Sequence, residues 1–515
     1  MWSMMIYLTE IWNLDIILSA AIINGFNGVE NIMPIGMAFF VDAFMGEYWM
    51  LLLSSLAYSC GLGILAILHI ILSKSERNSC PANMRPGCIS DLQKFLFFMA
   101  LTLKALGVCG HTASLSSFLG RQSQNQTPTD KDDDQIKRKR PGKFGRILGR
   151  CVIVLLAILA IILLSFMPWA VNFGIPAIGM VVATLLFVSG TSSYKHAAPQ
   201  VGLLTTVLRG FCDKGVVIVQ IQTPDEKAEH VGLKLPKIFA RMIPWWIIFI
   251  MCGVVSSIGD TYFLEQANNM QKGKVGGSKV PSFILLLFHN ITKFVFSKLI
   301  AVVAKKLYGK GFGKSIFPIG VIAAMFFSVV CCVVAANVET RRLELSNELE
   351  NSNTEIPMSM FWLLPQYFFL AAIDGISDYL CGDLEKVSGY SIACFCIAPK
   401  YSSSVSTYLR LCTNAAFGLG TVGSSISVQV ADKFSEIGRN STSSWFQETL
   451  NGSHLDYYYL TLAALSSINL VLCILVSIWY IHQHHKAMIG EMFTTPAIVK
   501  MLFGMIFSFH IFSLN

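Results

Sequence analysis

Charged side chains are scarce in this 515-residue chain: Asp, Glu, Lys and Arg make up 14% of the residues, against 54% that are hydrophobic. The mean hydropathy is +0.57. A soluble protein of this length would need far more polar surface to cover its core. The scarcity of charge therefore excludes an ordinary soluble protein and predicts an all-α polytopic membrane protein.

The sequence also lacks the patterns of several other classes. It has no GxSxG, HExxH or acyltransferase-like His-Asp motif, which argues against a membrane enzyme. No separate cleavable signal is visible, because MWSMMIYL is short and Glu10 follows it without an A-x-A site. Asp130 and Asp132–Asp134 stand in a mixed charge run that is typical of a solvated loop rather than a metal site. We expect no metal, no cofactor and no nucleic-acid partner.

Cysteine is rare outside the apolar runs. Most of the fourteen cysteines lie inside such runs, as Cys331 and Cys332 do, and there they behave as small hydrophobes. Only Cys80 and Cys88 share a short polar loop. They form a candidate disulfide if that loop faces an oxidising compartment.

What the sequence has in abundance is long apolar runs. A helix of about 20 apolar residues crosses the hydrocarbon core of a bilayer, and on this basis we predict about 11 full transmembrane helices, five before a polar linker and six after it. They cover Ile16–Val41, Trp49–Ser73, Phe95–Leu119, Cys151–Met167, Trp169–Gly190, Met242–Leu264, Val280–Ala304, Ser315–Asn337, Ile356–Tyr379, Ser403–Val430 and Tyr457–Ile481.

The linker divides the chain into two parts. We predict an N-terminal bundle over 1–190, a basic linker over 191–241, a C-terminal bundle over 242–481 and a tail with an apolar segment over 482–515. Basic residues crowd the linker and two other loops, so the positive-inside rule places these loops in the cytoplasm. The Cys80–Cys88 loop then faces outward. So does the loop with N-x-S/T sequons at Asn440 and Asn451, which are candidate glycosylation sites.

One carboxylate stands out in the run from Ile356 to Tyr379. An ionised Asp374 within the hydrocarbon would cost about 2.5–3.5 kcal/mol or more unless it faced a bundle interior or water. We interpret it as an acid that binds a proton or substrate in a transport cavity. The alternative is a carboxylate near a helix end that reaches interfacial water.

Other polar groups within spans have two readings each. His111 lies mid-span and either titrates near neutral pH or makes an interhelical hydrogen bond. The stripe of Asn24, Asn27 and Asn31, with Glu30 beside it, is typical of helix packing as well as of a polar wall. In the span Val280–Ala304, at least one of Lys293 and Lys298 is expected to snorkel towards the interface. Asp260 and Glu265, at the end of the span Met242–Leu264, are also expected to reach the interface.

Five stretches resemble one known family. They are GMAFFVDAFMGEYW (Gly36–Trp49), ALGVCGHTASLSSF (Ala105–Phe118), FGIPAIGM with SGTSSYKHAAP (Phe173–Pro199), MSMFWLLPQYF (Met358–Phe368) and LNGSHLDYYYLTLAALSSIN (Leu450–Asn469). In these stretches the chain is similar to the proton-dependent oligopeptide transporter (POT/PTR) family, in particular its plant nitrate and peptide transporters, within the major facilitator superfamily.

The resemblance implies two six-helix bundles around a central cavity that opens alternately to each side, with uptake driven by a proton gradient. It places Asp374 where the family has a tenth-helix glutamate and Thr112 where it has a fourth-helix lysine. With that lysine missing, we expect no cation near Asp374, and therefore a protonated acid at rest. Tyr367 and Gln366 are further candidates for the binding site, alongside His111. A conformational loop is expected at Asp42 and Gly46.

The first helix departs from the family pattern, because the segment Met5–Glu10 matches only the end of that helix and the acidic motif used for proton coupling is absent. We predict a secondary active, proton-coupled symporter of a small solute such as nitrate, a short peptide or a plant hormone or metabolite. It would lie in the lipid bilayer of the plasma membrane or the vacuole. The alternative is a truncated or degenerate paralogue that does not transport.

Overall fold

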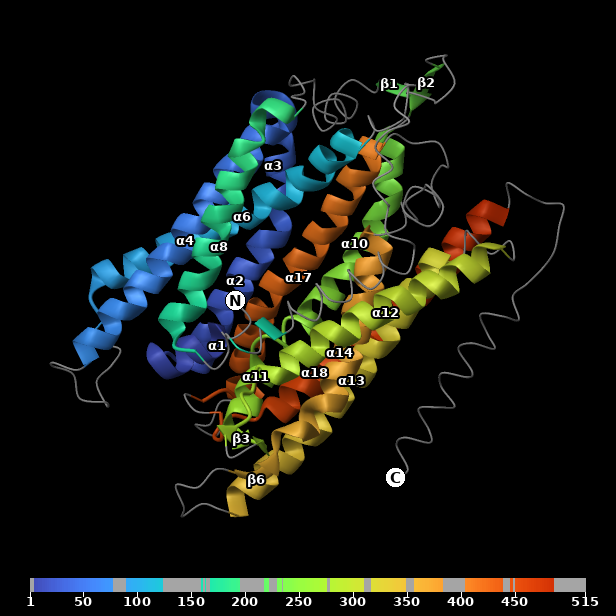
Figure 1. The fold of residues 1–515 in the computed structure, drawn as a ribbon. Coiled ribbons are helices and arrows are strands. Elements are labelled where there is room, and N and C mark those ends of the chain that lie inside the picture. Colours follow the sequence, from blue (N-terminus) through green and yellow to red (C-terminus); the bar gives the residue numbers. More distant parts are fainter. Residues whose placement is uncertain are drawn as a thin grey trace.

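The computed structural model describes most of the chain. It covers residues 4–76, 89–123, 159–160, 163, 167–194, 217–221, 229–233, 235–275, 278–309, 316–348, 356–382, 403–438, 445–447 and 450–485. Within these ranges helices dominate, and they fall into two groups that lie side by side in Figure 1. The predicted all-α architecture is confirmed.

The N-terminal group begins with short helices and continues with long apolar ones. Its elements are α1 (Met4–Ile6), η1 (Tyr7–Ile11), α2 (Ile16–Ile32), α3 (Pro34–Phe40), η2 (Val41–Met45), α4 (Gly46–Glu76), α6 (Asp91–Ser123), α8 (Trp169–Ser189) and η4 (Thr191–Ser193). Gly46 ends η2 with a φ of 72°, a conformation that glycine adopts without the steric penalty of a side chain. The chain can therefore reverse sharply between α3 and α4.

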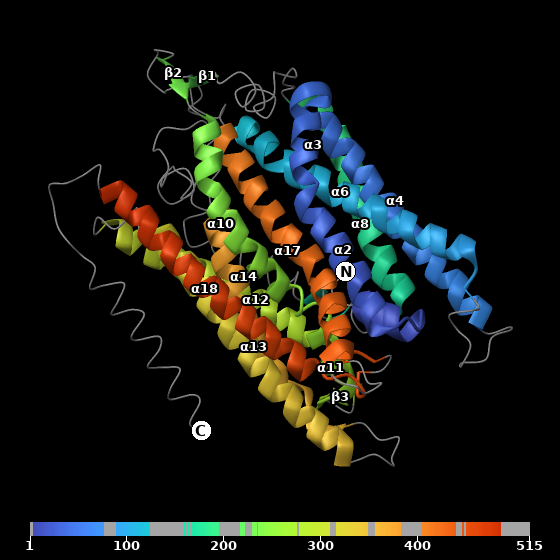
Figure 2. The same ribbon diagram turned by 180° about the vertical axis from the view of Figure 1, so that it is seen from behind.

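The C-terminal group contains most of the remaining helices. Its elements are α10 (Leu235–Ser256), α11 (Tyr262–Asn269), α12 (Ile284–Gly309), α13 (Ile316–Glu348), η6 (Met360–Leu363), α14 (Leu364–Gly382), α17 (Ser403–Gly438) and α18 (Leu455–His485). Figure 2 shows α17 running beside both α2 and α10, between the two groups.

Three small sheets connect the helices. An antiparallel hairpin, β1 (Val217–Ile221) with β2 (Glu229–Leu233), lies within the predicted linker, whose last part already belongs to α10. A parallel bridge joins β3 (Met270–Gln271) to β6 (Ile356–Ser359), at the opposite end of the molecule from the hairpin (Figure 1). A third pair, β4 (Lys274–Val275) with β5 (Ser278–Lys279), is antiparallel.

Two predicted spans differ from continuous helices. The span from Ile356 opens as strand β6 and a short 3₁₀ turn, and α14 begins only at Leu364, where Pro365 suits the first turn of a helix. The span Met242–Leu264 is interrupted between Ser256 and Tyr262 by a turn. Non-helical backbone at membrane depth is tolerated where it is buried in protein or lines a cavity.

Seven helical stretches of the described residues are long and apolar enough to cross a membrane. They are Ile16–Ser73, Asp91–Gly120, Trp169–Ser189, Ile284–Leu307, Ile316–Glu348, Met360–Leu380 and Leu455–Tyr480, and Met242–Ser256 is a shorter apolar helix. The first of them contains two predicted spans, since α2 and α4 both lie within it. The predicted number of eleven spans stays a prediction.

Glycines bring α17 into close contact with both groups. A Cβ at Gly418 would lie 2.8 Å from the carbonyl oxygen of Gly28 in α2, and a Cβ at Gly420 would lie 1.9 Å from that of Ile250 in α10. Helices in membranes associate closely where small residues let the backbones approach. The interface between the two groups is thus built on α17.

Candidate functional site

A cavity of about 470 Å³ lies between the two groups of helices. This volume is in the range of small-molecule sites, which are roughly 300–1,000 Å³. Its wall is contributed by α1, α2, α3, α4, α6, α10, the turn after α10, and α17. The lining residues are Met4, Met5, Ile23, Asn27, Glu30, Asn31, Pro34, Tyr58, Lys104, Val108, Thr112, Ser256, Ser257, Asp260, Asn414, Phe417 and Thr421.

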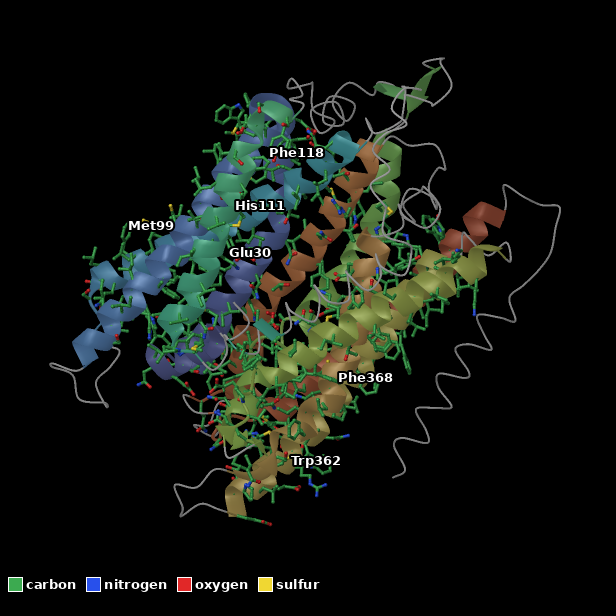
Figure 3. The ribbon with its side chains drawn as sticks, in the orientation of Figure 1. Glu30, Met99, His111, Phe118, Trp362 and Phe368 are labelled. Carbon is green, nitrogen blue, oxygen red and sulfur yellow. The ribbon has the colours of Figure 1, made fainter. Side chains whose placement is uncertain are left out.

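On the N-terminal side the wall carries a buried ion pair. Lys104 Nζ of α6 donates to Glu30 Oε1 of α2, and the two side chains are 8% and 16% exposed. Figure 3 shows Glu30 on α2, facing the interior of the molecule. A buried charge of either sign is tolerated when it has such a partner. The polar face predicted for this helix is therefore a cavity wall with a charge on it.

On the C-terminal side the wall includes the turn that interrupts the span after α10. Ser256 and Ser257 line the cavity here, together with Asp260, which is exposed to it while its neighbour Thr261 is fully buried. The prediction that Glu265 reaches the interface is wrong. Glu265 is 6% exposed and accepts hydrogen bonds from Thr9 Oγ1 at 3.1 Å and Asn269 Nδ2 at 3.0 Å, because α11 packs against the N-terminal segment after the break in the span. For Asp260, which is exposed beside the cavity, the interface stays a prediction.

Asp374 lies directly behind this wall. Its Oδ1 accepts a hydrogen bond from Ser256 Oγ at 2.7 Å, and its Oδ2 lies 3.0 Å from His289 Nε2 of α12. The two side chains are 9% and 10% exposed. The expectation that Asp374 has no basic neighbour is thus wrong, because α12 supplies His289, with Lys293 one turn further along, where the fourth helix has no lysine.

A second pair lies one helical turn further along the same two helices. Lys293 Nζ of α12 is 2.9 Å from Asp378 Oδ2 of α14, and the side chain of Asp378 is 58% exposed. The helices approach closely here, since a Cβ at Gly375 would lie 2.6 Å from the carbonyl oxygen of Lys293. We call the two pairs, His289–Asp374 and Lys293–Asp378, the ladder. Lys298, the other lysine of α12, places Nζ 5.2 Å from the centre of the Phe294 ring.

The other predicted binding residues separate into two sets. Thr112 lines the cavity. His111 does not, and its Nε2 lies 3.2 Å from Ser55 Oγ, so it matches the interhelical alternative (Figure 3). Tyr367 and Gln366 are fully buried away from the cavity wall; the Tyr367 hydroxyl donates to the Gly259 carbonyl, and Gln366 Nε2 donates to Gln266 Oε1. The geometry does not favour them as ligands.

Hydrogen bonds join the two groups of helices at both ends of the cavity. At the end with the β1–β2 hairpin, the Tyr408 hydroxyl of α17 donates to Asp42 Oδ2 at 2.6 Å. At the other end, Asn268 Nδ2 of α11 donates to Glu10 Oε1 at 2.9 Å, in addition to the bond between Thr9 and Glu265. Asp42 therefore makes a contact that alternate opening would break.

Of the residues predicted to lie in the outward loops, the structure describes Asn451. Cys80, Cys88 and Asn440 lie outside the described residues. Asn451 is exposed, and its Oδ1 accepts a hydrogen bond of 2.7 Å from Arg342 Nη1. Glycosylation of Asn451 stays a prediction.

Sequence reasoning missed the partners rather than the acid. Lys104 was passed over although it is a lone lysine in an apolar span, and such residues mark functional sites in membrane proteins. The spacing of four residues recurs in His289 and Lys293 and in Asp374 and Asp378. Matching spacings on two helices could have indicated the ladder, because residues four apart share a helix face.

Two bundles that enclose a central, charged cavity define a transporter fold of the major facilitator type. The sequence model of the POT family (PTR2) matches residues 48–439. The chain is 31% identical to Protein NRT1/ PTR FAMILY 5.5 of Arabidopsis thaliana over 93% of both chains. It is 26% identical to Protein NRT1/ PTR FAMILY 5.11 of the same plant, over 90% of this chain and 87% of that relative.

Solved structures agree on the fold. The POT family transporter PepTSo aligns with a TM-score of 0.59 and 14% identity, over 94% of this chain and 95% of that one. A POT family transporter in complex with 5-aminolevulinic acid aligns with a TM-score of 0.59 and 11% identity, over 93% and 92%. The chain belongs to the POT family. It is a multi-pass membrane transporter and not an enzyme, and the alternative of a non-transporting paralogue is not favoured.

Proposed function

We propose that this protein is a proton-coupled symporter in which the pair of Asp374 and His289 carries the coupling proton. The observation that supports this most is the hydrogen bond from Ser256, a cavity residue, to the buried Asp374 carboxylate. Through it, a change of protonation at the pair alters the cavity wall. The proposed cargo is a small solute, and the proposed location is the plasma membrane or the vacuole; no metal or cofactor is expected.

The pair suits this role because its two members share one proton in a neutral arrangement. Asp374 as the acid with neutral His289, or carboxylate with imidazolium, both leave the pair uncharged, whereas loss of the proton leaves a buried negative charge. A buried net charge is unfavourable in a cavity that closes and excludes water. The solute-loaded transporter therefore changes conformation most readily when the pair holds its proton, and the proton is released on the inner side before the empty transporter returns.

Transport assays on the full chain in liposomes test the proposal. The candidate solutes are nitrate, dialanine and 5-aminolevulinic acid, each measured in two modes: uptake driven by an imposed proton gradient, and exchange of labelled against unlabelled solute at equal pH. Asp374→Asn should abolish the driven uptake while keeping exchange, since exchange needs no net proton transfer. Asp378→Asn is the matched control, because it removes the same group from the exposed rung of the ladder.

Two results would contradict the proposal. One is proton-driven uptake by Asp374→Asn at the rate of the unmodified chain. The other is an unmodified chain that carries none of these solutes in either mode, although it is inserted and folded. A preserved rate in Asp378→Asn is expected in either case, and it shows that the effect belongs to the buried rung.

A further inference from the structure

We infer that Asp260 binds a positively charged nitrogen of the solute, so that the cargo is amine-bearing rather than a simple anion such as nitrate. The inference rests on the proposed function only in taking the central cavity as the solute site. It starts from the charges on the cavity wall, which are two carboxylates and one ammonium. These groups are Glu30, Asp260 and Lys104.

Two of the three charges neutralise each other. Lys104 donates to Glu30, and both side chains are largely buried beside the cavity. An anion that enters the cavity would have to take Lys104 from Glu30 and leave that carboxylate unpaired, which is strongly unfavourable for a buried group. Lys104, the one lysine that the described part of the chain places on the wall, is therefore not free to hold a simple anion.

Asp260 is the charge that remains. Among the described residues, no side chain makes a hydrogen bond or an ion pair with its carboxylate, although it opens into the cavity. Its electrostatic neighbours among the described residues are His289, Asp374 and Lys293. These belong to the ladder, where each has a partner of its own.

Counting charge over the whole region gives the same result. The pair on the N-terminal wall is neutral, and so is Lys293 with Asp378. The pair of His289 and Asp374 is neutral when it holds one proton. Asp260 then leaves a net charge of about −1 at the cavity, and a cationic group on the solute restores neutrality.

The position of Asp260 in the fold also suits a residue that binds the solute. It lies in the turn that interrupts the predicted span after α10, and interrupted helices commonly form the substrate sites of transporters. Ser256 and Ser257 on the same turn, and Asn414 across from it on α17, offer neutral polar groups to the rest of a small molecule. Such a carboxylate, kept unpaired inside a membrane protein, is expensive unless it has a function.

Equilibrium binding to the purified full chain in nanodiscs tests the inference without any transport step. The probes are 5-aminolevulinic acid and levulinic acid, which differ only in the amino group, together with nitrate. A charge-assisted hydrogen bond to Asp260 should make the amino acid bind roughly 10- to 100-fold more tightly than levulinic acid. Nitrate should bind most weakly.

Substitutions assign the preference to one carboxylate. Asp260→Asn should remove the preference between the two acids, and Asp260→Glu should keep most of it. Equal binding of the two acids, or no binding of the amino-bearing one, overturns the inference. So does a preference that survives in a folded Asp260→Asn chain.

The outcome is separable from that of the proposed function. A chain that prefers the amine but moves no solute with protons would contradict the proposed symport and keep the role of Asp260. Proton-driven nitrate uptake with no preference for the amine would do the reverse. In that case Glu30→Gln, which releases Lys104, should strengthen nitrate binding.

Discussion

The two walls of the cavity use ion pairs in different ways. On the N-terminal wall, Glu30 and Lys104 meet at the cavity surface itself. On the C-terminal wall, the ladder lies one layer deeper and is hydrogen-bonded to the cavity residue Ser256. The first arrangement fixes a charge pattern that a solute meets directly. The second keeps the His289–Asp374 pair out of contact with the solute, while the hydrogen bond from Ser256 still links the pair to the cavity wall.

The walls also share a property. Each of these pairs joins two helices of the same half, α2 with α6 or α12 with α14. The contacts across the halves at the two ends of the cavity are single hydrogen bonds, such as that between Tyr408 and Asp42. The strong electrostatic interactions around the cavity therefore stay intact when the halves rock against each other.

The largest effect is expected on the N-terminal wall. Lys104→Met leaves the Glu30 carboxylate buried without a partner, and breaking a buried pair in this way costs about 3–5 kcal/mol of stability. The free energy of unfolding in mixed micelles measures this. The double variant Glu30→Gln with Lys104→Met should recover most of the loss, and a single variant as stable as the unmodified chain would refute the pairing.

A smaller loss is expected where the ladder depends on close helix packing. Gly375→Ala places a Cβ 2.6 Å from the Lys293 carbonyl oxygen and so pushes α12 away from α14, at about 1–3 kcal/mol. The matched control is Gly63→Ala in α4, where nothing lies within 4 Å and a gain of up to about 1 kcal/mol is expected. Equal unfolding energies for the two variants would contradict the close approach.

The next largest effect is expected at the hydrogen bond between Tyr408 and Asp42, which joins the two halves. Tyr408→Phe removes one hydroxyl donor from Asp42, a loss of about 0.5–1.5 kcal/mol that acts only on the end of the cavity beside the β1–β2 hairpin. Distances between spin labels on α3 and α17 should shift towards open populations. Tyr457→Phe in α18 is the control, because its ring stacks on Trp445 and the ring is kept. Identical distance distributions in the two variants would count against this contact as a gate.

The smallest effect belongs to the outer rung of the ladder. Lys293→Met removes a cation from an acid that is 58% exposed, and exposed pairs contribute only about 0–1 kcal/mol. The same unfolding measurement applies here. A loss as large as that of Lys104→Met would show that the two walls do not differ as described.

The sequence predicted the architecture well, because apolar runs and polar loops are local patterns. It also identified Asp374 as an inward-facing acid, which the structure places at 7% exposure. It did not predict the partners, since Glu30 and Lys104 are 74 positions apart and His289 comes from a helix with no motif around the histidine. These partners depend on which helices pack against each other, and a local sequence pattern does not carry that information.

The break after α10 is a second case of this limit. Hydropathy shows one continuous run over Met242–Leu264, so Asp260 and Glu265 were expected at its end. The run Ser256–Asp260, which contains Gly259, consists mainly of weak helix formers and carried a signal for the turn. Only the packed structure shows that this turn faces a cavity.

The closed ion pairs within each half determine how much charge the protein itself displaces when the halves move. Each pair moves as a unit of little net charge, so this displacement is small. Over a complete cycle the protein returns to its starting conformation, and the charge that crosses the bilayer is that of the cargo and its protons. A monovalent cation taken up with one proton would carry two positive charges, each worth about 2.3 kcal/mol per 100 mV. At such a voltage, the electrical term alone could hold a solute gradient of about three orders of magnitude. Current per molecule taken up would thus give the summed charge of the cargo and its protons.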